Sequence, residues 1–141
     1  MTRIAFIRRT AQGLPGDELG AAALEFALAV PVLIMMIWGI FQVGLLYEAN
    51  AGIQHALGEG ARYATLYPMP TDTQITARIS AKVFGTTNGT FSTPTVTTPA
   101  STVCTNCKLL TVTYTTPVNF LFMPGPTVTV SRSKVVYLPT N

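Results

Sequence analysis

The chain has 141 residues, of which 48% are hydrophobic and 11% are charged. This length accommodates one anchor and one small domain but not two independent cores, and the apolar excess indicates a membrane component. The net charge of +3 includes no run of bases interleaved with aromatic residues, which argues against a nucleic-acid-binding protein.

A short basic segment, residues 1–20, precedes the first long apolar run. It holds Arg3, Arg8 and Arg9, and its own apolar stretch, residues 4–7, is far too short to cross a bilayer. Because basic residues resist translocation, we expect this segment to stay in the cytoplasm as a leader.

The next segment, residues 21–47, is predicted to be a transmembrane helix. From Phe26 to Tyr47 it carries no charged residue, and Gln42 is its only strongly polar residue. A helix of about 20 such residues crosses a hydrocarbon core of roughly 30 Å. Tyr47 fits the outer membrane–water interface, and the chain beyond it is expected outside the cytoplasm.

Glu25 is a lone carboxylate at the amino-terminal edge of this run. Inserting a carboxylate into a membrane costs a few kcal/mol, so such a residue usually has a partner. Cleavage after Gly20 would supply one, because it creates an α-ammonium group on Ala21 about one helical turn away, in the same chain or in the next subunit of an assembly. Two alternatives involve no such partner: a plain signal anchor, and a secretory signal removed after Ala51.

The sequence Gly-Ala-Ala-Ala-Leu-Glu-Phe at residues 20–26 resembles the cleavage site of type IV prepilins and pseudopilins. With its continuation Ala-Leu-Ala-Val-Pro-Val-Leu, it looks more narrowly like the TadE-like pseudopilins of the tight-adherence (Tad, or Flp) pilus system. Residues 60–64, Gly-Ala-Arg-Tyr-Ala, are similar to a small-residue helix of the same family. The resemblance covers about residues 18–66.

This resemblance implies a processing site and an assembly site. A prepilin peptidase would cut between Gly20 and Ala21, and Glu25 would recruit or align the subunit by pairing with the ammonium group of a neighbour. Phe26 completes the motif, and Pro31 falls where pilin helices often carry a proline. A proline inside a helix removes one backbone hydrogen bond and kinks or locally opens the helix.

Residues 48–67 are predicted to continue the same helix as a stem, which Pro68 ends. Apolar residues recur in this stretch at spacings of three and four, as on one face of a helix. Gly52, Ala56 and Gly60 form a row of small residues that would let another helix approach closely. The alternative is that this face packs against the chain's own domain.

Residues 68–141 are predicted to form a small extracytoplasmic domain. Thr71 and Gln74 fit a capping box for a short amphipathic helix over about residues 72–84. A small antiparallel β-sheet follows over about residues 90–138. Its expected strands are residues 91–98 (weakened by Pro94), 110–114, 127–130 and 134–138. The fold class is therefore α+β and pilin-like, with a long transmembrane and stem helix, a short second helix and a small sheet.

An apolar stretch at residues 118–123 interrupts the alternating pattern of the strands. Prolines bound it on both sides. We interpret it as a loop that plugs the sheet, and the alternative is an exposed contact patch.

Cys104 and Cys107 are the only cysteines. Outside the cytoplasm two cysteines more often oxidise to a disulfide, with free thiols as the alternative, and a zinc site would need four ligands. His55 is not tied by spacing to any acid or nucleophile, so we expect a solvated or packed helix residue. No metal and no other cofactor is expected.

The sequence contains no glycine-rich phosphate loop, nucleophile elbow or paired carboxylate motif, so we expect neither an enzyme nor a small-molecule substrate. We expect a minor pilin or pseudopilin of a Tad (Flp) pilus, held in the bacterial inner membrane and contributing to pilus assembly, secretion or adhesion. Its expected partners are the membrane, the prepilin peptidase, other pilin subunits and the assembly machinery. The alternatives are a membrane-anchored periplasmic binding domain and a secreted β domain cleaved after Ala51.

Overall fold

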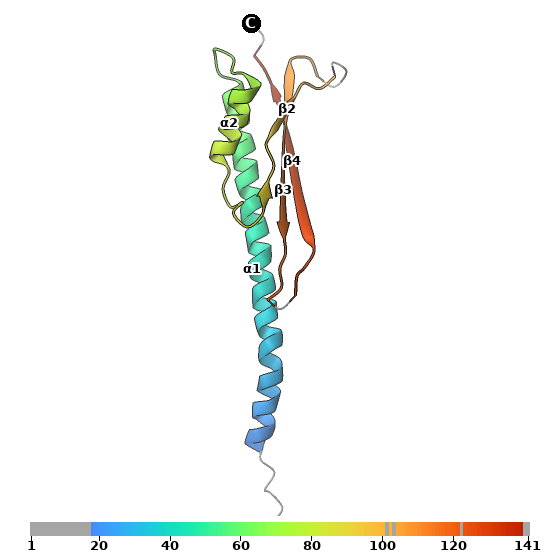
Figure 1. Ribbon diagram of the computed structural model, residues 1–141. Coiled ribbons are helices and arrows are strands. Elements are labelled where there is room, and N and C mark those ends of the chain that lie inside the picture. Colours follow the sequence, from blue (N-terminus) through green and yellow to red (C-terminus); the bar gives the residue numbers. More distant parts are fainter. Residues whose placement is uncertain (1–17, 101, 103, 122, 140–141) are drawn as a thin grey trace, which may run out of the picture. The chain divides into compact units, whose positions relative to one another are not determined.

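The computed structural model describes residues 18–100, 102, 104–121 and 123–139 (Figure 1). It contains a long helix, a second short helix and a four-stranded antiparallel sheet, which confirms the predicted α+β, pilin-like architecture. The chain divides after Ile34 into two compact units, which are described separately below. Residues 1–17, which hold most of the predicted leader, lie outside the described residues.

The first unit is described from residue 18 onward and consists of the amino-terminal part of α1 (Glu18–Ala64). Leu24, Phe26 and Leu28 are 64%, 70% and 69% exposed, although they are large apolar side chains. From Phe26 onward the helix is apolar on all sides in this unit, and it continues through Pro31. A helix without a polar face is typical of a membrane span.

The second unit begins at Met35 and contains the rest of α1. The helix ends at Ala64, three residues before the predicted end at Tyr67. Two short-range bonds tighten the chain there, from Thr65 N to Arg62 O at 3.3 Å and from Leu66 N to Tyr63 O at 3.1 Å. The residue before a proline avoids the α conformation, so Pro68 ends the helical geometry upstream of itself.

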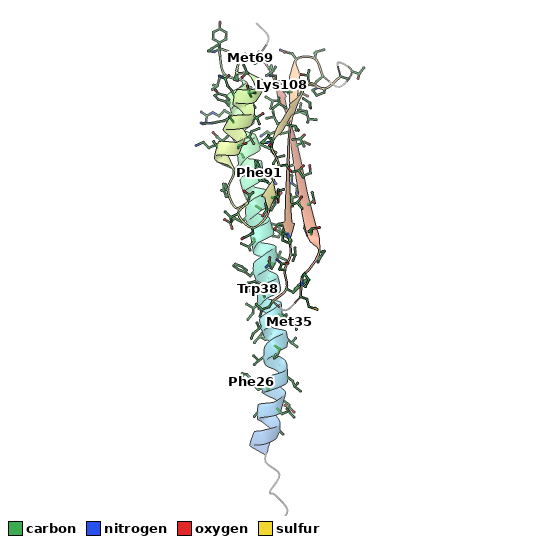
Figure 2. The ribbon with its side chains drawn as sticks, viewed as in Figure 1. Phe26, Met35, Trp38, Met69, Phe91 and Lys108 are labelled. Carbon is green, nitrogen blue, oxygen red and sulfur yellow. A yellow bond between two sulfur atoms is a disulfide. The ribbon has the colours of Figure 1, made fainter. Side chains whose placement is uncertain are left out.

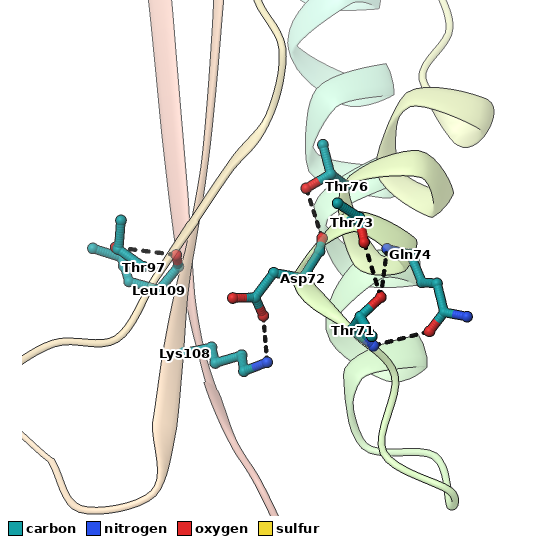
Figure 3. A network of polar contacts seen from close by, with 8 residues as sticks. All are labelled: Thr71, Asp72, Thr73, Gln74, Thr76, Thr97, Lys108 and Leu109. Carbon is teal, nitrogen blue, oxygen red and sulfur yellow. Dashed lines mark hydrogen bonds and ion pairs between the residues drawn. The ribbon is translucent and has the colours of Figure 1, made fainter.

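The second helix, α2 (Asp72–Lys82), has the predicted capping box. The Thr71 side chain accepts from the Gln74 N–H, and the Gln74 side chain accepts from the Thr71 N–H at 2.9 Å (Figure 3). Ile75 and Ile79 are fully buried, as their spacing of four predicts. The helix ends at Lys82 rather than at residue 84, because the next residue, at the C-cap, already has extended backbone.

The sheet is built around β3 (Cys107–Pro117), which pairs with β4 (Thr127–Tyr137) along its whole length. Two short strands, β1 (Thr90–Phe91) and β2 (Thr95–Thr97), pair with successive parts of β3. They share the edge opposite β4, and together they replace the single strand predicted over residues 91–98. Proline lacks the N–H that a ladder needs, and Pro94 lies between the two pieces. The strands predicted at 127–130 and 134–138 are one continuous strand.

The core of the second unit lies between the sheet and the two helices (Figure 1). Alternate residues of β3 face inward, so Leu110, Val112 and Tyr114 are buried. They belong to one cluster with residues of α1 and α2, which include Ile53, Ala56, Leu57, Ile75 and Ile79.

The loop between β3 and β4, residues 118–126, does not plug the sheet, and that prediction is wrong. Phe120, Leu121 and Met123 are 40%, 45% and 63% exposed. The positions under the sheet are already filled by side chains from the helices, and the loop lies beyond the ends of both strands. The alternative prediction of an exposed apolar patch describes it correctly.

Candidate processing and packing sites

The predicted cleavage bond, between Gly20 and Ala21, lies within the first turn of α1. The first four N–H groups of any helix lack partners inside the helix. A peptidase that needs an extended substrate would therefore disrupt few hydrogen bonds by unwinding this turn. The position is compatible with processing, and Ala21 would then begin the helix.

Glu25 is exposed on α1, four residues after Ala21. Residues four apart lie on the same helix face, so the Glu25 carboxylate and a new ammonium group on Ala21 would be neighbours. Within the described residues Glu25 forms no ion pair. Phe26 and Pro31 are also exposed, so this whole segment presents its side chains outward in the monomer.

The row of small residues Gly52, Ala56 and Gly60 lies in different surroundings, because it is buried inside the second unit. A Cβ atom added to Gly60 would overlap Cγ1 of Ile79, on α2, and would lie 2.9 Å from its Cδ1. A Cβ atom on Gly52 would overlap the backbone carbonyl of Phe84. The close approach that the row permits is therefore made by α2 and the segment after it, within the same chain.

Cys104 and Cys107 are joined by a disulfide at the start of β3. Asn106, inside the closed loop, has a φ of 60° and donates its side-chain amide to Leu138 O at 3.1 Å. The disulfide and this contact hold the loop that leads into β3 against the end of β4. His55 is exposed, with its ring centroid 5.8 Å from that of Phe84. No cluster of metal ligands occurs among the residues described.

Sequence reasoning missed a contact between α1 and the β3–β4 loop. Asn119 O accepts two hydrogen bonds, from Trp38 Nε1 at 2.7 Å and from Gln42 Nε2 at 3.1 Å. Gln42 is the one strongly polar residue of the apolar run, and this contact gives it a partner. Trp38 lies on the part of α1 that faces the loop (Figure 2). The separation of 81 residues between Trp38 and Asn119 leaves no periodic signal that could have predicted the contact.

The ion pairs that join the helices to their neighbours were also missed. Asp72, in the first turn of α2, pairs with Lys108 of β3 (Figure 3). Arg78 Nη2 of α2 lies 3.5 Å from Glu59 Oε2 of α1. Such pairs are worth about 1 kcal/mol or less where they are exposed.

These features define an α+β protein of the pilin-like class, whose long apolar helix is consistent with a single membrane anchor. α1 is long and apolar enough to cross a membrane, and its most apolar stretch is not buried inside the protein. Residues 20–62 match the family described as TadE-like protein. The matched region contains the predicted processing residues and the small-residue row, but neither α2 nor the sheet. No curated protein and no solved structure matches the chain.

Proposed function

We propose that the protein is a pseudopilin or minor pilin that takes part in assembling a Tad pilus. The observation that carries this proposal is the TadE-like match over residues 20–62, which begins at the glycine of a prepilin-type motif. The exposed apolar segment that follows supports a single membrane anchor. The family suggests a component of the Tad pilus apparatus and is not known for enzymatic activity.

In the proposed life cycle, residues 1–20 form a cytoplasmic leader that a prepilin peptidase removes after Gly20. The mature chain stays in the inner membrane through α1, with α2 and the sheet in the periplasm. Glu25 then pairs with the ammonium group of a neighbouring subunit. This pairing is favourable in a membrane because each charge neutralises the other where water is absent. The proposed partners of the mature protein are other pilin subunits and the assembly machinery.

The amino terminus of the membrane-extracted protein tests this proposal. We expect intact-mass measurement to show a chain that begins at Ala21. A change of Gly20 to a bulky residue, Gly20→Leu, should leave the leader attached. The peptidase is expected to fit only a residue without a side chain at this position, so leucine would be excluded. Gly13→Leu, inside the leader, is the matched control and should be processed normally. A wild-type chain that starts at Gly52, or is never cut, would contradict the proposal.

A further inference from the structure

The β3–β4 loop, residues 118–126, carries exposed apolar side chains on a closed backbone. Phe120 N donates to Met123 O at 3.0 Å, and Met123 N donates to Phe120 O at 3.1 Å. At the base of the loop, Val118 N donates to Pro126 O at 3.0 Å. A Cβ atom on Gly125 would overlap the Val118 carbonyl, so the chain is tightly folded here. The loop is a compact turn that displays Phe120, Leu121 and Met123.

Several backbone polar groups of the described part of this loop are satisfied within the protein, as an apolar medium favours. Backbone N–H and C=O groups that enter hydrocarbon must be satisfied within the protein. Phe120 and Met123 satisfy each other, and Asn119 O is satisfied twice, by Trp38 and by Gln42. Pro117, Pro124 and Pro126 have no N–H to satisfy.

The loop lies beside the apolar part of α1 and extends the apolar surface of that helix. Near Trp38 the helix exposes Ile37, Ile40 and Phe41 by 59%, 71% and 53%. A groove of about 280 Å³ between α1 and the end of β3 is lined by Trp38, Phe41, Gln42, Leu45, Asn88, Pro117 and Asn119. Apolar helix and apolar loop therefore meet at the level of Trp38.

This contact is hard to reconcile with a membrane boundary at Tyr47. Nine residues separate Trp38 from Tyr47, which corresponds to about 13 Å along a helix. A boundary at Tyr47 would submerge the ends of β3 and β4, where Thr129 is exposed and its hydroxyl lies 3.2 Å from that of Thr115. The other edge of β4 pairs with no described strand, and an open sheet edge is not tolerated in lipid. A boundary near Trp38 leaves the strands in water. With this boundary the membrane span would be residues 21–40, which is about the 20 residues that a span requires.

We propose that the β3–β4 loop docks on the outer leaflet of the membrane that holds α1, with Phe120, Leu121 and Met123 in contact with lipid acyl chains and Trp38 at the interface. The occupant of this apolar patch is thus lipid rather than a protein. Trp38 then fulfils the interfacial role typical of tryptophan, and the span ends near it rather than at Tyr47. The inference rests on the membrane anchorage within the proposed function, but not on a role in pilus assembly.

Trp38 is the only tryptophan, which makes its depth directly measurable. The full chain would be reconstituted into phosphatidylcholine–phosphatidylglycerol vesicles that carry a doxyl quencher either near the headgroup or near the chain end. We expect the shallow quencher to reduce Trp38 fluorescence more than the deep quencher does. Stronger quenching by the deep label would overturn the proposed boundary. A chain that fails to float with the vesicles would overturn the membrane anchor itself, so the two failures are distinguishable.

The loop itself is tested by moving the single tryptophan. Trp38→Phe combined with Leu121→Trp places the probe on the loop, and Trp38→Phe combined with Tyr67→Trp is the control, since Tyr67 is 87% exposed beyond the end of α1. We expect the shallow quencher to reduce the fluorescence of the tryptophan introduced by Leu121→Trp and to leave the fluorescence of the Tyr67→Trp control unchanged. A loop probe that floats with vesicles yet is not quenched would overturn lipid docking. So would loop fluorescence that responds to the protein-to-lipid ratio instead of the quencher, because a second copy would then cover the loop.

Discussion

Gly60 lies where one methyl group would collide with a fully buried side chain. Gly60→Ala would force its Cβ atom into Ile79, which has no solvent-facing position to retreat to. Overpacking of this kind costs about 1–3 kcal/mol. We therefore expect a lower midpoint for unfolding of the detergent-solubilised chain, followed by circular dichroism.

Gly58→Ala is the matched control on the same helix. The nearest atom to an added Cβ there is Lys134 Nζ at 4.0 Å, so the new methyl group meets only ordinary contacts. Alanine favours a helix over glycine by about 1 kcal/mol, so Gly58→Ala should raise the midpoint or leave it unchanged. Equal unfolding midpoints for Gly60→Ala and Gly58→Ala would show that α2 does not pack on Gly60 as described.

Glu25 is proposed to act through its charge, which its amide analogue removes with little change in shape. We expect Glu25→Gln to insert into the membrane and to be processed, but to lose most pili. A hydrogen bond to a charged group contributes about 1.5–3 kcal/mol, or roughly a ten-fold or greater change in the subunit-docking equilibrium. Pili would be counted by electron microscopy, with the membrane fraction and intact mass measured in parallel.

Glu48→Gln gives the corresponding control, because Glu48 is an exposed carboxylate on the same helix but outside the prepilin-type motif. It should assemble pili at the normal level. Normal piliation of Glu25→Gln would refute the pairing role, and equal loss in both variants would point to a general effect of helix charge.

At the scale of elements, α2 depends on the way its first turn is capped. Thr71→Ala removes the acceptor for the Gln74 N–H and also the hydroxyl that contacts Thr73 at 2.9 Å. Loss of an N-cap costs about 1 kcal/mol. Because Ile75 and Ile79 enter the shared core from this helix, we expect the whole second unit to be destabilised by that amount in denaturant unfolding.

Thr71→Ser retains a capping hydroxyl and should unfold like the wild type. If Thr71→Ala also unfolds like the wild type, the capping box contributes little, and the Asp72–Lys108 ion pair at the same end of α2 would be the contact that holds the helix there.

At the scale of the whole molecule, the disulfide reports on which side of the membrane the second unit lies. In intact cells a membrane-impermeant maleimide should label Cys104 and Cys107 only after an external reductant has been added. An Asp17→Cys change, combined with Gly20→Leu so that the leader stays attached, should be labelled at position 17 only after the cells are permeabilised. Labelling of the native cysteines without reductant would contradict an oxidised, extracytoplasmic domain.

The sequence predicted those features whose signals are local. The charge-free run from Phe26 to Tyr47 indicated the long apolar helix, and the Thr71–Gln74 spacing gave the start of α2 to the residue. The alternation around Leu110 located β3. Each of these depends on a period or a cap that a short window of sequence contains.

Features decided by tertiary contact were not predictable in this way. Nothing near Gly60 identifies Ile79 as its neighbour, and nothing near Gln42 identifies Asn119. The apolar composition of residues 118–123 suggested burial, yet the core beneath the sheet was already filled by helix side chains. A local pattern reveals that a surface is apolar, but it does not reveal what covers that surface.

The burial of Gly52 and Gly60 inside a single subunit changes how a genetic screen of this protein should be interpreted. Substitutions in a glycine row on a pilin helix would ordinarily be assigned to a contact between subunits when they abolish pili. Here a side chain added at Gly52 would collide with Phe84, in the segment that follows α2, and a side chain added at Gly60 would collide with Ile79 of α2. Alleles at these two glycines are therefore expected to affect whether the subunit is made and survives proteolysis, whereas in the proposed function alleles at Glu25 affect whether a surviving subunit is recruited.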